Sequence, residues 1–171
     1  MRNSKPIIGI SACLTNSIVR YDAKSQYNKL LTETLLEHFH LLPICPEFEC
    51  GLGVPRAPIE LVACNESICI LGRDDKTLDV TTKLMDYTKS KVKTLSEISG
   101  YVFKARSPSC GVGNVPVYSL EGKESYYTNG VFVSELIKRY PNLPVIDDSM
   151  LDTEEQVKIF IKKALRFLAE A

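Results

Sequence analysis

The sequence lacks a Cys-x-x-Cys pair, although it contains six cysteines, and it has only two histidines, His38 and His40. The ligand spacings of zinc ribbons and zinc fingers are therefore absent. A thioredoxin-type redox pair is excluded by the same spacing. The cysteines remain candidates for buried packing thiols, for ligands of another kind of metal site, or for a nucleophile.

The sequence also lacks net charge and long apolar runs. Its 21 basic and 21 acidic side chains cancel, so we expect no wholesale attraction to a large nucleic acid or to an anionic membrane. No apolar run approaches the roughly 20 residues of a membrane span. The N-terminal segment has no apolar core of a secretory signal. We therefore expect a cytoplasmic protein without a membrane partner, in which disulfides are disfavoured.

The composition predicts one folded domain over residues 1–171. With 44% hydrophobic and 25% charged residues, the chain resembles neither disordered nor fibrous proteins. It contains no repeat, low-complexity tract or Gly/Ser linker.

Short apolar runs alternate with segments of helical periodicity. Buried strands are predicted over residues 5–11, 41–44, 101–103 and 143–146. Helices are predicted over 24–39, 79–98 and 129–140, with a last helix after a capping-box pattern of Asp152 and Glu155. The remaining segments predict a hairpin over 59–64 and 68–71, a loop over 51–58 and a small β excursion over 112–128. The expected fold class is α/β, a single-domain three-layer sandwich with a mostly parallel, Rossmann-like sheet of about four core strands.

Three cysteines follow predicted strands of the parallel sheet. Cys13 follows the first strand, Cys45 the second, and Cys110 lies in the loop after the third. Because ligands bind beyond the carboxyl ends of parallel strands, these thiols are expected to converge on a soft metal site, for which an iron–sulfur cluster is the natural candidate. The alternative is packing, since cysteine is among the most often buried residues. For Cys64 and Cys69, inside apolar runs, packing is the favoured interpretation.

Several motifs resemble the thiouracil desulfidase family, long known only as a bacterial domain of unknown function. Two long strings carry the resemblance: Cys-Pro-Glu followed by Gly-Leu-Gly-Val-Pro-Arg within residues 45–58, and Lys-Ala-Arg-Ser-Pro-Ser-Cys-Gly at 104–111. Ser-Ala-Cys-Leu at 11–14 and Val-Arg-Tyr-Asp at 19–22 are similar to the family's opening motif. The resemblance covers residues 6 to 147, with the motifs in the expected order.

This resemblance implies a [4Fe–4S] cluster held by Cys13, Cys45 and Cys110, with one iron left without a protein ligand. It further implies non-redox removal of sulfur, as sulfide, from a small thiolated molecule such as 2-thiouracil or a thiouridine. The open iron would polarise the C=S bond as a Lewis acid, and water would replace the sulfur.

Polar residues of the same motifs are candidates for catalysis. The Cys-Pro-Glu motif implies Glu47 as the acid–base group; alternatively, its carboxylate accepts backbone N–H bonds from the loop over 51–54. Ser107 and Ser109 either hydrogen-bond the cluster or substrate, or cap the turn between them. Asp22 either orients the base or substrate, or is a solvated surface residue.

Four cations in these loops, Arg20, Arg56, Lys104 and Arg106, are candidates for neutralising the cluster or binding a nucleotide phosphate, with surface solvation as the alternative. Tyr21 is a candidate for stacking on a pyrimidine ring, or for packing.

Cys50 departs from the family pattern and leaves a second function open. As a fourth ligand, it would give a non-catalytic iron–sulfur or zinc-binding sensor or carrier. A metal-free cysteine enzyme is a third class, but His38 and His40 lie together near a helix end, and no third catalytic group is evident.

Overall fold

The computed structural model describes residues 5–170; residues 1–4, the start of the segment considered above for a secretory signal, and residue 171 lie outside it. Sheet A consists of β1 (Ile7–Ser11), β2 (His40–Ile44), β5 (Ile98–Phe103) and β8 (Val145–Asp147). Its strand order is β2-β1-β5-β8, and every neighbouring pair is parallel. The predicted α/β fold with four core strands is therefore confirmed.

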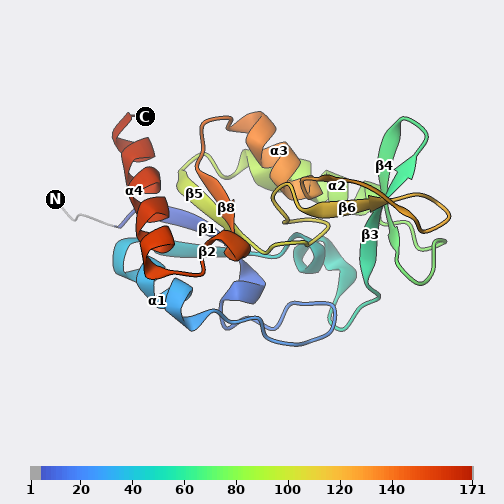
Figure 1. Ribbon diagram of the computed structural model, residues 1–171, viewed down its shortest axis with the longest axis horizontal. Helices are drawn as coiled ribbons and strands as arrows, with labels where there is room; N and C mark the ends of the chain where they lie inside the picture. Colours follow the sequence, from blue (N-terminus) through green and yellow to red (C-terminus); the bar gives the residue numbers. More distant parts are fainter. Residues whose placement is uncertain (1–4, 171) are drawn as a thin grey trace.

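Helices cover both faces of sheet A (Figure 1). On one face lie α1 (Lys29–His38) and α4 (Glu154–Glu170). On the other lie α2 (Thr81–Lys93) and α3 (Val131–Arg139). Within the described range, no helix has both the length and the apolar character needed to cross a membrane.

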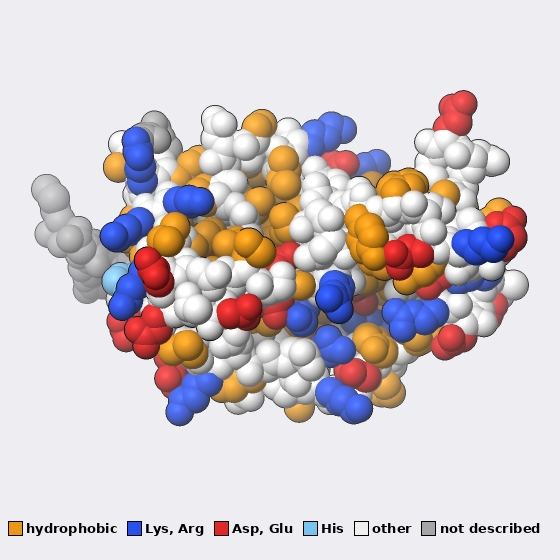
Figure 2. All heavy atoms as spheres, viewed as in Figure 1, with side chains coloured by type: hydrophobic (Ala, Val, Ile, Leu, Met, Phe, Trp, Pro, Cys, Tyr) orange, Lys and Arg blue, Asp and Glu red, His pale blue; other side chains and the backbone are white. Residues whose placement is uncertain are grey.

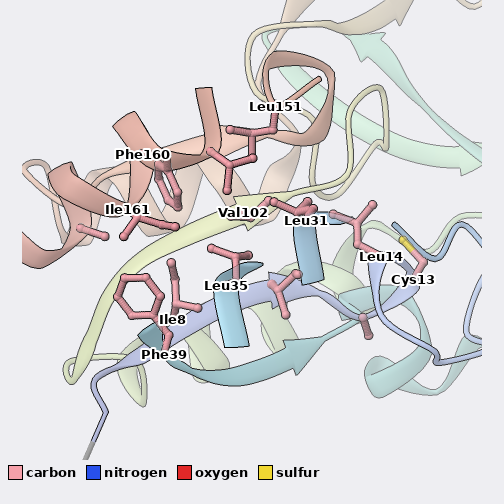
Figure 3. Close-up of a cluster of buried hydrophobic side chains, with 14 of the residues drawn as sticks. Ile8, Cys13, Leu14, Leu31, Leu35, Phe39, Val102, Leu151, Phe160 and Ile161 are labelled. Carbon is pink, nitrogen blue, oxygen red and sulfur yellow. The ribbon is translucent and has the colours of Figure 1, made fainter. Parts of the chain in front are cut away.

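Each face of sheet A has its own hydrophobic core. Figure 3 shows the core beneath α1 and α4, with Cys13 at its end, where β1 passes into a helical turn. In the core beneath α2 and α3, the rings of Tyr101 and Phe103 stack with centroids 3.9 Å apart. Gly9 of β1 leaves room for this stack, because a Cβ there would lie 2.2 Å from the Tyr101 ring.

A second sheet, sheet B, lies at the other end of the molecule (Figure 1). It consists of β3 (Ile59–Cys64), β4 (Ser67–Gly72), β6 (Val115–Tyr118) and β7 (Glu124–Thr128) in the order β4-β3-β6-β7. The predicted hairpin is β3 and β4, paired antiparallel. The predicted small β excursion is the hairpin of β6 and β7. It is part of a larger sheet than expected, because β6 pairs in parallel with β3 and so joins the two hairpins.

Several local predictions differ from the structure. The helix predicted over 79–98 spans only Thr81–Lys93, and Ile98 already belongs to β5. The helix predicted from residue 24 begins at Lys29, because the Asn28 side chain caps it by accepting the Leu31 N–H at 3.1 Å. The capping box of α4 is shifted by one residue: Thr153 and Gln156 exchange the reciprocal hydrogen bonds expected of Asp152 and Glu155. The loop predicted over 51–58 starts within a helical turn, Phe48–Leu52, in which Gly51 adopts a φ of 88°.

Candidate metal centre and substrate pocket

A pocket of about 230 Å³ lies beyond the carboxyl ends of β1, β2 and β5, where the loops of sheet A meet the edge of sheet B. The end of β2 and the loops of sheet A supply most of its lining: Ser11, Ala12, Cys13, Arg20, Tyr21, Ile44, Cys45, Pro46, Glu47, Arg56, Lys104, Ala105, Arg106, Ser107, Pro108 and Cys110. Pro58, Ile59 and Arg73 add a wall from sheet B. The pocket therefore occupies the position that parallel sheets use for ligands.

The three cysteines predicted as ligands line this one pocket. Cys13 lies in the helical turn after β1, Cys45 directly after β2, and Cys110 in the loop after β5. All three are free thiols. Burial, and secondarily the neighbouring Cys45, raise the pKa of Cys13 to about 12. Burial also raises the pKa of Cys110 well above its ordinary value, with Cys45 and Cys13 among the contributing charges. The three thiols thus lie within electrostatic range of one another.

This donor set fits an iron–sulfur cluster. Thiolates are the ligands of such clusters, and a cluster spreads its ligands over several irons. Within residues 5–170, no group of three or more His, Cys, Asp or Glu side chains lies close enough together to hold a single metal ion. Cys13, Cys45 and Cys110 each contribute one thiol from a separate loop to a shared cavity, the kind of donor set that a multi-iron group uses.

Cys50 is not part of this set. It packs against the core of sheet B instead of lining the pocket. Its thiol donates a hydrogen bond to the carbonyl oxygen of Glu47 at 3.3 Å. The Cys50 side chain is therefore engaged by the Glu47 carbonyl and by the core of sheet B, outside the pocket.

Glu47 is a buried carboxylate with both oxygens engaged. The Arg56 guanidinium donates to Oε2, from Nη2 at 2.8 Å and from Nε at 3.2 Å. The Ser109 hydroxyl donates to Oε1 at 2.9 Å. The hydrogen bonds to the Glu47 carboxylate therefore come from side chains, and not from the backbone N–H groups of the loop over 51–54.

Arg56 connects the carboxylate to two loops. Its Nη1 donates to the carbonyl oxygen of Val19 at 2.8 Å and to that of Gly53 at 2.9 Å. The backbone N–H of Arg56 also donates to the carbonyl oxygen of Tyr21. The guanidinium therefore fixes Glu47 and the pocket loops at the same time.

Arg20 and Tyr21 line the pocket, whereas Asp22 does not. The Arg20 guanidinium lies 5.3 Å from the centre of the Tyr21 ring. Its Nε donates to Oδ1 of Asp22 at 3.1 Å, and this hydrogen bond lowers the pKa of the Asp22 carboxyl. The Asp22 carboxylate therefore contacts the pocket lining through the Arg20 side chain.

The loop after β5 supplies Lys104, Arg106 and Ser107 to the lining. The Lys104 ammonium pairs with Asp148 at 2.7 Å. Arg106 adopts a φ of 61°, in the left-handed region that non-glycine residues rarely use. The Ser107 hydroxyl accepts the N–H groups of Ser109 and Cys110, both at 3.2 Å, as a cap of this turn.

Three residues of the site were missed by the sequence analysis. The Ser11 hydroxyl accepts the Lys104 N–H at 2.9 Å. It also hydrogen-bonds Cys110, and this bond partly offsets the rise that burial causes in the pKa of Cys110. Asp148 follows β8, so its place at a strand end was an available signal. Arg73, after β4, carried no comparable signal, because its approach to sheet A depends on how the two sheets meet.

The pocket lining is rich in cationic side chains. Figure 2 shows Lys and Arg side chains gathered over the middle of the molecule, between the two sheets. Five line the pocket: Arg20, Arg56, Arg73, Lys104 and Arg106. Four of them pair with carboxylates, namely Asp22, Glu47, Glu60 and Asp148. The attraction for an anionic group therefore rests mainly on Arg106 at the rim.

The fold and the pocket define an α/β protein with a cysteine-lined centre suited to a soft metal group. The family model for 2-thiouracil desulfurase matches residues 8–148, and the chain belongs to that family. Among solved structures, it is similar to TudS, a [4Fe–4S]-dependent thiouracil desulfidase. The two are 26% identical and superpose with a TM-score of 0.67 over 94% of this chain and 99% of the other. No curated protein gives a significant sequence match.

Proposed function

We propose that this protein is a [4Fe–4S]-dependent desulfidase that removes sulfur, as sulfide, from a small thiolated nucleobase or nucleoside such as 2-thiouracil or a thiouridine. The observation that carries the proposal is the convergence of Cys13, Cys45 and Cys110 on one pocket that also contains the buried carboxylate of Glu47. The cavity of about 230 Å³ is smaller than the ~300–1,000 Å³ typical of drug-sized ligands. It therefore suits a small molecule.

The reaction is a substitution without net electron transfer. The oxygen of water bonds to the thiocarbonyl carbon, the carbon–sulfur bond breaks, and the products are a carbonyl and hydrogen sulfide. Cys13, Cys45 and Cys110 would hold the cluster, which supplies a soft Lewis acid toward the sulfur.

The side chains of the pocket divide the remaining tasks. Glu47 accepts a proton from the attacking water and later delivers it to the departing sulfide. Ser109 and Arg56 hold its carboxylate in place, so that it needs no reorientation during the reaction. The ring of Tyr21, in the pocket wall, stacks on a planar base.

The rim cations suit a negatively charged substituent on the substrate. Arg106 is exposed, and within the described chain it pairs with no carboxylate. A thiouridine phosphate would place its charge near such a group. We expect Arg106→Gln to raise the KM of the phosphorylated nucleoside by about tenfold, while the KM of the free base changes little.

The function is tested by anaerobic purification and reconstitution. The wild-type protein is expected to be brown, to absorb near ~400 nm and to release sulfide from 2-thiouracil or thiouridine. Cys13→Ser, Cys45→Ser and Cys110→Ser are expected to lose iron, whereas Cys50→Ala is expected to keep it. Loss of iron in Cys50→Ala, without turnover in the wild type, would support the four-cysteine sensor or carrier instead. A colourless reconstituted wild type would overturn the iron–sulfur proposal.

A further inference from the structure

Outside the pocket, two thiols meet on the β3–β4 hairpin. The register pairs Cys64 with Ser67 and Val62 with Cys69. Cys64 and Cys69 are therefore diagonal neighbours on one face of the hairpin. Ile59 and Leu61, whose side chains alternate with theirs along β3, belong to the core on the opposite face.

These two thiols are accessible and lie side by side on one face of the hairpin. Both are free and half-buried, in contrast to the buried packing role that their apolar surroundings in the sequence favoured. The register therefore brings two soft donors to one partly exposed position. Consistent with this proximity, hydrogen bonding with Cys64 is the largest cause that raises the pKa of Cys69, to about 11.

The hairpin geometry favours a bridging ion over a disulfide. Diagonal pairs across an antiparallel ladder have Cα atoms about 7–8 Å apart, whereas disulfides join Cα atoms about 4.4–6.8 Å apart. A cation about 2.3 Å from each sulfur spans sulfurs up to roughly 4.6 Å apart. Side chains of diagonal neighbours on one face of the hairpin bring their sulfurs to that separation by side-chain rotation.

We propose that Cys64 and Cys69 form a second metal site, which binds one soft monovalent cation of the Cu(I) class between two thiolates. Thiolates select such ions over harder ones. Binding exchanges two thiol protons, which pass to solvent, for one cation, and neither sulfur nor metal is oxidised. Asp79 lies near Cys69, but its carboxylate is a hard donor and already accepts the Thr81 N–H at 2.8 Å.

The sequence provides a selective readout for this site. Trypsin cuts after Arg56 and Arg73, and the peptide between these cuts contains Cys64 and Cys69 and no other cysteine. The folded protein is mixed anaerobically with enough Cu(I) to fill both the pocket cysteines and the hairpin, alkylated with N-ethylmaleimide and digested. We expect Cu(I) to reduce alkylation of both cysteines by about tenfold in the wild type.

Single substitutions separate a shared ion from independent binding. In Cys64→Ser, Cys69 is expected to be alkylated as in the metal-free protein, and Cys69→Ser is expected to expose Cys64 in the same way. Cys50→Ser serves as the matched control and is expected to retain protection of the peptide.

Three results would overturn this proposal: no protection in the wild type, protection that persists in both serine variants, or a peptide lighter by two hydrogens, which marks a disulfide. The readout reports on Cys64 and Cys69 alone and requires no turnover. Failure of the proposed desulfidase function and failure of this site are therefore distinguishable.

Discussion

The Ser109 hydroxyl donates a hydrogen bond to Oε1 of Glu47 at 2.9 Å, and the Ser109 residue has no exposed surface. Arg56 occupies the other carboxylate oxygen. Glu47 is thus held from two sides, by a hydroxyl from the loop after β5 and by a guanidinium from the loop before β3. The carboxylate belongs as much to the structure of the pocket as to its proposed chemistry.

We expect Ser109→Ala to destabilise the metal-free protein by about 1–3 kcal/mol, because the substitution leaves a buried carboxylate oxygen without its donor. Urea denaturation measures this change. Ser107→Ala is the matched control, since its hydroxyl caps a turn at a less buried position. Equal free energies of unfolding for Ser109→Ala and the wild type would contradict the assigned role of the hydrogen bond.

Glu47→Gln is expected to lower the turnover number by about 10²–10⁴-fold, the range typical of lost acid–base catalysis. The iron content should remain that of the wild type, because Glu47 is not among the proposed ligands. Sulfide release and iron analysis on the same preparation measure both quantities. A parallel loss of iron and turnover would show that Glu47 acts by supporting the ligands.

Tyr101→Phe is expected to stabilise the metal-free protein by about 1 kcal/mol. The Tyr101 hydroxyl is fully buried and has no hydrogen-bond partner, and an unsatisfied buried donor costs about 1–3 kcal/mol. Thermal and chemical unfolding measure the change. Thr88→Val, which removes a second buried hydroxyl that has no partner in the described range, should shift stability in the same direction. A loss of stability in Tyr101→Phe would mean that an internal water pairs with this hydroxyl.

The stability of the metal-free protein is expected to fall in alkaline solution. Burial raises the pKa of Cys13 from 9.0 to about 12, so the folded chain holds this thiol proton more tightly than the unfolded chain. The resulting stabilisation is complete below the unfolded pKa and is lost as the pH rises through the folded pKa.

Urea denaturation at about pH 8.5 and about pH 10.5 measures this loss. Cys13→Ala should show a smaller decrease, with the remainder due to the other groups whose pKa values are raised, among them Cys110, Cys45 and Tyr101. An identical decrease in Cys13→Ala and the wild type would rule out the contribution of Cys13.

The predictions that succeeded rest on local patterns. Buried parallel strands are short apolar runs, and Cys13, Cys45 and Cys110 lie in the segments that follow three of them, so their meeting at one end of the sheet follows from topology. Helix starts were less exact, because competing caps lie within a few residues of one another. Asn28 and Thr153 cap the helices where other polar residues were expected to.

The parts that could not be predicted depend on contacts between distant segments. Arg73 reaches the pocket only because sheet B stands against the loops of sheet A. The partners of Glu47 could not be predicted either. Several loops carry cations and hydroxyl groups, and the order of these residues along the chain does not specify which of them will contact the carboxylate. Ser109 lies 62 positions away along the chain from Glu47.

The pocket walls belong to two sheets that share no strand. A small rotation at their junction would therefore change the width of the entrance while every ladder hydrogen bond stays intact. The contacts that oppose such a movement are those that cross the junction, among them the guanidinium of Arg56 on the Val19 carbonyl and the packing of Leu84 of α2 in the core of sheet B. A wider entrance would therefore require these contacts to shift, and no strand of either sheet to separate.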